Sequence, residues 1–324
     1  MNQLLKWIIA IGTVIGFPIT ANSQSFPHKP IKIVVPFASG SGTDAVARLA
    51  TQSLVEALKQ QVIVENRPGA NGVIAAEFVA KSAPDGYTLF LTTNSTQASN
   101  PSLMKSIPYD PIKDFASVAR LGNFPASILA IDPRLPVKSV AELISYAKIN
   151  PGKLSYATGN SMGMITGATF ARMAGIDLLQ VPYKSTPPAM TDVMGGQVSM
   201  MFTDIMTAIS NIRAGKIRAL AVASKEPSSL LPEVPPMART PGLEEFNWVP
   251  TWVAVFAPAG TPPSIIDVLN REFVKIVTRK DIVDRFTALG FNAFGSTPQE
   301  LSAFVASEIS RWKKLVKDAG IQPE

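Results

Sequence analysis

The chain has 324 residues, of which 46% are hydrophobic and 17% charged, as is typical of a globular protein. Its formal net charge is +6, but the basic residues are scattered along the chain, which argues against nucleic-acid binding. The absence of cysteine rules out disulfide bonds, and with only one histidine, His28, it argues against zinc and copper sites. We therefore expect no metal and no cofactor.

Residues 1–23 are predicted to be a secretory signal peptide. Lys6 supplies the positive charge, an apolar stretch runs to Ile19, and Ala21-Asn22-Ser23 has the small-x-small pattern of a cleavage site. The apolar stretch is short for a membrane span, and Pro18 interrupts it. Cleavage would leave an exported chain of 301 residues (324 − 23), enough for two domains.

Strand and helix signals then alternate, which predicts an α/β fold with mostly parallel sheets. Strands are expected at 31–37, 62–65, 87–92, 117–122, 126–131, 154–157, 178–183, 198–202, 218–223 and 252–257. One helix is expected over 44–59, and others end at Lys81, Ile149, Ala174 and Lys317. Ser139 with Glu142 and Thr297 with Glu300 have the spacing of capping boxes. A proline-rich loop is expected over 227–241.

Polar loops follow four of these strands, which end at Phe37, Thr92, Thr158 and Phe202. The carboxyl ends of parallel strands meet at one edge of a sheet, and open α/β sheets bind ligands there. The first loop also opens a helix, whose free N–H groups and positive dipole end favour an anion. Since no catalytic machinery accompanies these loops, the pattern favours binding over chemistry.

Two enzyme classes compete with this interpretation. Gly40-Ser-Gly42-Thr-Asp-Ala45, with Glu65 ending the next strand, fits a dinucleotide-binding pattern, but export argues against a nicotinamide cofactor. Gly159-Asn-Ser161-Met-Gly163 fits a nucleophile elbow, but the one histidine, His28, precedes the serine, so no base stands in the expected position. A Ser–Lys arrangement is a further alternative, although nothing in the sequence marks one. An exported serine hydrolase using Ser161 remains the alternative from the enzyme class.

The same chain resembles a known family, the tripartite tricarboxylate transporter receptors, which are TctC-like or Bug periplasmic solute-binding proteins. The motifs that carry the resemblance are 30–38 with Gly42-Thr-Asp44, 64–70, 83–89, 109–115, 181–184, 195–198, 220–222 and 257–262. The resemblance implies a two-domain periplasmic binding protein of the type II-like, Venus-flytrap kind, with a ligand cleft between the domains. One domain would comprise 24–123 and 253–324, and the other 124–252, with crossings near 123–126 and 250–253.

It also implies a non-enzymatic, monomeric receptor for a small organic carboxylate. Such a receptor delivers its ligand to inner-membrane subunits of a tripartite tricarboxylate-type transporter; a ligand-presenting sensor is the alternative. The implied ligand contacts come from the loops 37–44, 92–95 and 158–161, from Tyr183 and from the strand end at 202–204. The individual contacts expected are Phe37, Ala38, Ser39, Ser41, Gly42, Thr43, Asp44, Thr92, Asn94, Ser95, Thr158, Asn160, Ser161, Tyr183, Thr203 and Asp204.

Three features depart from the family's usual pattern at this expected site. Ser39-Gly-Ser-Gly42 replaces a Pro-Gly-Gly-Gly loop, Met164 stands where a histidine is common, and Thr203-Asp204 replaces an Asp-Asn pair. The resemblance therefore implies the class of ligand without naming it.

Overall fold

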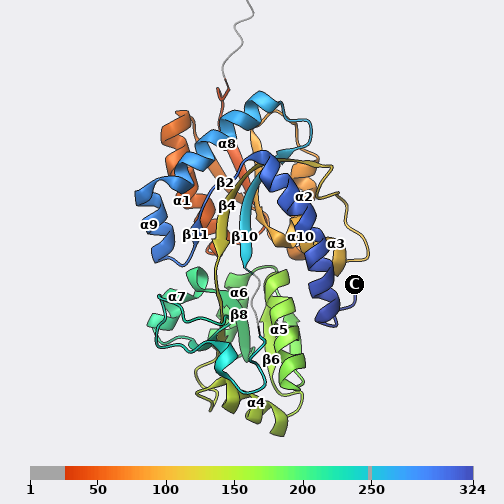
Figure 1. Cartoon of the computed structure of the whole chain (residues 1–324), viewed down its shortest axis with the longest axis vertical. Helices are drawn as coiled ribbons and strands as arrows, with labels where there is room; N and C mark the ends of the chain where they lie inside the picture. Colours follow the sequence, from red (N-terminus) through yellow and green to blue (C-terminus); the bar gives the residue numbers. More distant parts are fainter. Residues whose placement is uncertain (1–25, 247–249, 324) are drawn as a thin grey trace, which may run out of the picture.

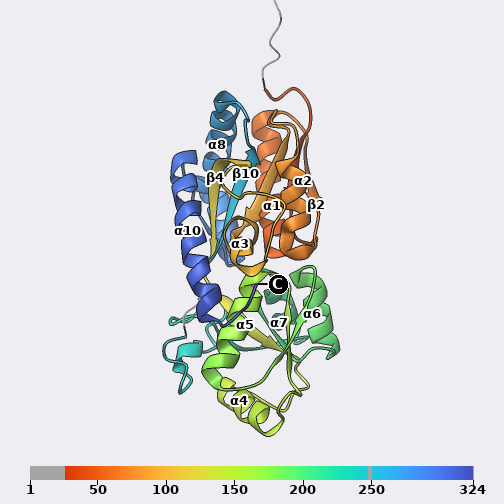
Figure 2. The same cartoon turned by 90° about the vertical axis from the view of Figure 1, so that its right-hand side faces the viewer.

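The computed structural model describes residues 26–246 and 250–323, and its chain forms two α/β lobes, one above the other (Figure 1). We call the lobe with the six-stranded sheet the first lobe and the lobe with the five-stranded sheet the second lobe; Figure 2 shows both from the side. Within the described ranges, no helix is long and apolar enough to cross a membrane. The predicted signal peptide lies outside these ranges.

The sheet of the first lobe has the strand order β11-β4-β10-β3-β1-β2. Its strands are β1 (Ile31–Val35), β2 (Val62–Asn66), β3 (Thr88–Thr93), β4 (Phe115–Phe124), β10 (Thr251–Pro258) and β11 (Asn292–Ala293). Its helices and helical turns are α1 (Gly42–Leu58), η1 (Ala70–Gly72), α2 (Val73–Ala80), η2 (Ser95–Ser99), α3 (Asn100–Leu103), α8 (Pro263–Thr278), α9 (Lys280–Ala288) and α10 (Pro298–Asp318). Alternate side chains of β1 face opposite ways: Ile33 and Val35 pack in the core with α1 and α8, and Val34 in the core with α2 and α10.

The sheet of the second lobe has the order β7-β6-β8-β5-β9. Its strands are β5 (Ser127–Ile131), β6 (Ser155–Thr158), β7 (Leu179–Pro182), β8 (Met200–Asp204) and β9 (Arg218–Val222). Its helices are α4 (Val140–Ile149), α5 (Ser161–Ala174), α6 (Thr186–Gly195), α7 (Ile205–Arg213) and η3 (Met237–Arg239). Leu129 of β5 packs in the core with α4 and α5, whereas Ile128 packs with α6 and α7.

The prediction of mostly parallel sheets is wrong, because both sheets are mixed. β1 is parallel to β2 and β3, and β6 is parallel to β7 and β8. β10, however, is antiparallel to β3 and β4, and β5 is antiparallel to β8 and β9. The chain enters β5 and β10 directly from the other lobe, so these strands begin at the edge between the lobes, where the parallel strands end.

The chain passes between the sheets twice. β4 ends at Phe124 and β5 begins at Ser127, so two residues make the first crossing. The second crossing lies between the end of β9 at Val222 and the start of β10 at Thr251. The domain boundaries expected at 123/124 and 252/253 stay a prediction.

The long helix α10 packs on the first sheet and extends to the second lobe (Figures 1 and 2). Near its end, Trp312 and Leu315 meet Ile165 of α5 around a space between the lobes. The buried carboxylate of Glu308 accepts hydrogen bonds from the indole nitrogens of Trp252, at 2.9 Å, and Trp312, at 3.1 Å. One carboxylate thus ties α10 to the strand that follows the second crossing.

Candidate functional site

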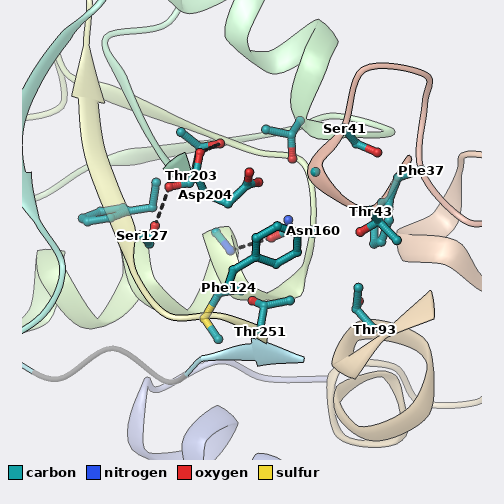
Figure 3. Close-up of a pocket in the computed structure, with 15 residues that line it drawn as sticks. Phe37, Ser41, Thr43, Thr93, Phe124, Ser127, Asn160, Thr203, Asp204 and Thr251 are labelled. Atoms are coloured by element: carbon teal, nitrogen blue, oxygen red, sulfur yellow. Dashed lines mark hydrogen bonds between the residues drawn. The ribbon is translucent and has the colours of Figure 1, made fainter. Parts of the chain in front are cut away.

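A small cavity lies where the two lobes meet (Figure 3). Seven of the contacts expected from the sequence line it: Phe37, Ser41, Gly42, Thr43, Asn160, Thr203 and Asp204. Thr93 and Phe202, which lie in segments already assigned to the site, line it as well. Sequence reasoning missed six further residues: Phe124, Ser127, Met162, Gly163, Thr186 and Thr251. Phe124, Ser127 and Thr251 lie where the chain crosses between the lobes, and their only signal was the family's crossing points.

The amino end of α1 presents backbone donors to this cavity. Ser41 is the N-cap, and its hydroxyl accepts the N–H of Asp44 at 3.2 Å. The N–H groups of Gly42 and Thr43 have no acceptor among the residues that the structure describes, and both residues line the cavity. Two free donors at a helix N-terminus are suited to an anionic oxygen.

Gly42 is needed for the lobes to approach here. A Cβ on it would lie 2.8 Å from Oδ1 of Asp204 and 2.9 Å from the ring of Phe124. Its backbone is helical, so space, and not a left-handed conformation, favours glycine.

Three further helices begin at the cavity. Asn160 caps α5, and its side chain accepts the N–H of Gly163 at 2.8 Å. Thr186 is the first residue of α6, and Asp204 is the N-cap of α7. The positive dipole ends of four helices therefore converge on one small space. No lysine, arginine or histidine lines it within the described part of the chain, so a bound anion would be held by N–H and hydroxyl donors.

Asp204 is the exception to this pattern of donors. Its carboxylate accepts the N–H of Thr207 at 2.7 Å and the Thr207 hydroxyl at 2.8 Å. Burial raises the pKa of the Asp204 carboxyl. The hydrogen bonds from Thr207 lower this pKa, but by less than burial raises it, so that the pKa stays above its usual value. Figure 3 shows Asp204 beside Thr203, across the cavity from Ser41 and Thr43.

Asp44 does not line the cavity, although the sequence suggested it as a contact. Its carboxylate accepts hydrogen bonds from the Gly40 N–H (3.0 Å), Arg48 Nε (2.9 Å) and Asn66 Nδ2 (2.9 Å). Burial alone would raise the pKa of Asp44, but the bonds from Arg48, Gly40 and Asn66 outweigh burial and lower it. Asp44 therefore fixes the loop that opens α1.

Hydrogen bonds between hydroxyls join the lobes beside the cavity. The Ser161 hydroxyl of the second lobe lies 2.8 Å from both the Ser95 and the Ser99 hydroxyls of the first lobe. The Ala38 N–H donates to the Ser185 hydroxyl at 3.0 Å. Ser161 is fully buried, and among the described residues its hydroxyl has only other hydroxyls as side-chain partners, so that part of the chain gives it no base of the kind a nucleophile needs.

The other expected contacts lie close to the cavity without lining it. Thr92 pairs with Thr96 at 2.6 Å, and Ser39 lies 3.5 Å from the carboxylate of Asp44. Asn94 is fully buried, and neither atom of its amide group has a partner among the described residues. Ala38, Ser95 and Ser161 make the hydrogen bonds between the lobes described above. Thr158 and Tyr183 line a second groove, which shares Asn160 with the cavity.

That second groove also contains Lys184 and Met164. The Tyr183 hydroxyl donates to Asp192 at 2.6 Å, and desolvation together with this carboxylate raises the pKa of Tyr183 to about 12. Tyr183 is therefore engaged with its own lobe.

Comparison with known proteins identifies the family. The model of the tripartite tricarboxylate transporter family receptor matches residues 46–321. The chain belongs to this family. It is 37% identical to Protein BugT of Bordetella pertussis over 323 residues, which cover 99% of this chain and 98% of BugT.

Solved structures of this family share the fold. "R. palustris Rpa4515 with adipate" superposes with a TM-score of 0.87 at 34% identity, covering 92% of this chain and 100% of that one. "MatC (Rpa3494) from Rhodopseudomonas palustris with bound malate" gives 0.82 at 34% identity, covering 90% and 100%. The periplasmic binding protein fold expected from the resemblance is thus confirmed. Members of this family are periplasmic solute-binding receptors and not enzymes, so the hydrolase and dinucleotide interpretations are set aside.

Proposed function

We propose that this protein captures a small organic carboxylate in the cavity between its lobes and delivers it to the inner-membrane subunits of a tripartite tricarboxylate-type transporter. The observation that carries the proposal is the convergence of four helix N-termini on a cavity lined by hydroxyl groups and free N–H groups. Such donors neutralise a carboxylate without a basic side chain. The dicarboxylates bound to Rpa4515 and MatC, adipate and malate, support this class of ligand.

The proposal includes a hinge motion about the two crossings. A ligand stabilises the closed form only through contacts that it makes with both lobes. The cavity is lined from both sides, and the hydroxyl contacts of Ser161 add to closure. Residues 1–23 would direct export to the periplasm, and the mature chain would act as a monomer.

The test is thermal unfolding of the mature chain with a panel of mono-, di- and tricarboxylates. The protein is first unfolded and refolded, so that ligand retained during purification is removed. A ligand at about one hundred times its Kd should stabilise the fold by roughly 2.7 kcal/mol. The matched control is the uncharged amide of each acid, in which every carboxyl group is replaced by an amide, and it should give no shift. If no carboxylate stabilises the stripped protein, the proposal fails.

Delivery is tested separately, by uptake of the identified ligand into membrane vesicles that contain the transporter subunits. Uptake should require the ligand-loaded receptor. Tight binding without any receptor-dependent uptake would favour the ligand-presenting sensor instead.

A further inference from the structure

Asp204 is the only ionisable side chain that lines the cavity within the described ranges. It belongs to the second lobe, yet its Oδ1 approaches the first lobe so closely that a Cβ on Gly42 would lie 2.8 Å away. A ligand in this cavity therefore contacts or closely approaches a carboxylate as well as the donors at the amino end of α1.

The hydrogen bonds of Asp204 are incomplete. A carboxylate has room for about four hydrogen bonds. Within the described part of the chain, Asp204 receives them only from the N–H and the hydroxyl of Thr207, and the hydroxyl has one proton to share between both oxygens. No cationic side chain compensates its charge there. The carboxylate oxygens of Asp204 can therefore accept further hydrogen bonds from a group in the cavity.

The two halves of the cavity therefore make opposite demands on a ligand. The free N–H groups of Gly42 and Thr43 and the helix dipoles attract a carboxylate. Asp204 repels one, and a partly buried carboxylate without a cation is costly. A ligand with a carboxylate and an ammonium group meets both demands.

We propose that Asp204 makes the receptor selective for amino acids, whose ammonium group it binds while the α1 end of the cavity holds a carboxylate. This inference rests on the proposed carboxylate-binding function and narrows its ligand class. Succinate and other acids without an amine are then poor ligands, because they leave Asp204 facing a second anion.

The test compares pairs of ligands that differ only in an amino group: alanine with propionate, aspartate with succinate, and glutamate with glutarate. Calorimetric titration of the refolded mature chain near neutral pH gives the Kd of each. At least one amino acid should bind tenfold or more tightly than its amine-free partner. Asp204→Asn keeps the shape and the cap of α7 and should reduce that preference at least tenfold. Asp177→Asn, which removes an exposed carboxylate elsewhere on the second lobe, should leave it unchanged.

The outcomes separate the two proposals. If the amine-free member of a pair, or malate or adipate, binds at least as tightly as every amino acid, Asp204 does not select an ammonium group, and the carboxylate receptor stands. The same holds if Asp204→Asn leaves the preference intact. If the wild-type chain binds no carboxylate of either kind, the proposed function itself fails.

Discussion

Asp44 and Asp204 both lie at the amino end of a helix, one in each lobe, and their surroundings are opposite. Asp44 receives hydrogen bonds from Arg48, Asn66 and the Gly40 N–H, and its pKa is lowered. Among the described residues, Asp204 receives hydrogen bonds to its carboxylate from Thr207 alone; it lines the cavity and has a raised pKa. An aspartate with a complete set of partners stabilises a loop, whereas an aspartate with an incomplete set leaves an interaction for a ligand to make.

The largest expected difference concerns stability. Asp44→Asn should lower the free energy of unfolding by about 2 kcal/mol, because it removes a charge-assisted bond to Arg48 and an acidic group from the first turn of α1. Asp204→Asn should change it by less than about 1 kcal/mol, since asparagine also caps a helix. Urea unfolding of both variants without ligand measures this. Equal losses of unfolding free energy in the two variants would show that Asp44 and Asp204 contribute equally to stability, against this prediction.

Gly42 of the first lobe lies opposite Asp204 of the second, and it tests whether the close approach of the two lobes matters for ligand binding. Gly42→Ala should weaken ligand binding at least tenfold, or about 1.4 kcal/mol, because the new methyl group meets Asp204 of the second lobe when the lobes close. The stability of the ligand-free protein should fall as well, by about 1 kcal/mol, because Phe124 lies in the first lobe, as Gly42 does, and its buried ring must shift whether or not the lobes close. Gly195→Ala is the matched control, because a Cβ there has only one neighbour, at 4.0 Å. Unchanged affinity in Gly42→Ala would mean that the ligand binds with the lobes apart.

The smallest expected effect is a dependence of stability on pH, which has opposite signs for Asp44 and Asp204. Since the pKa of Asp44 is lower in the folded state than its unfolded value of about 3.9, its contribution is fully present above that pH and is lost as the pH falls through the folded pKa. The contribution of Asp204, whose pKa is raised, is fully present below about pH 3.9 and is lost as the pH rises through the folded pKa. Unfolding measured from acid to neutral pH should therefore show Asp44→Asn losing most relative to wild type at neutral pH, and Asp204→Asn losing least there. Parallel curves for the two variants would contradict this.

Much of the local structure was predictable because it depends on neighbours in the sequence. Both hydrogen bonds of the capping box are present at Thr297 and Glu300, since each side chain accepts the backbone N–H of the other residue. Ser139 also caps its helix, but Glu142 accepts the N–H of Lys138 instead of completing the box. The helix after the first loop begins at Gly42, two residues earlier than predicted.

Strand directions and cavity residues that depend on the path of the chain between the lobes were not predictable from neighbours in the sequence. The directions of β5 and β10 follow from the crossings, and the cavity residues Ser127 and Thr251 come from the starts of those strands. The predicted polar loop after β3 is instead a buried helical turn, Ser95–Ser99, in which the Ser99 hydroxyl bonds to the backbone of Ser95. For Asp204, the sequence identified the residue, but not that it has no cationic partner in the described part of the chain.

The carboxylate of Glu308 links two of the four tryptophans in the chain, Trp252 and Trp312. The first lies just after the second crossing, and the second lies where α10 meets the other lobe. Indole fluorescence responds to the hydrogen bonding and polarity around the ring. The protein thus contains its own optical reporter beside the second crossing, and we expect the proposed closure on a ligand to change the emission of the unlabelled chain.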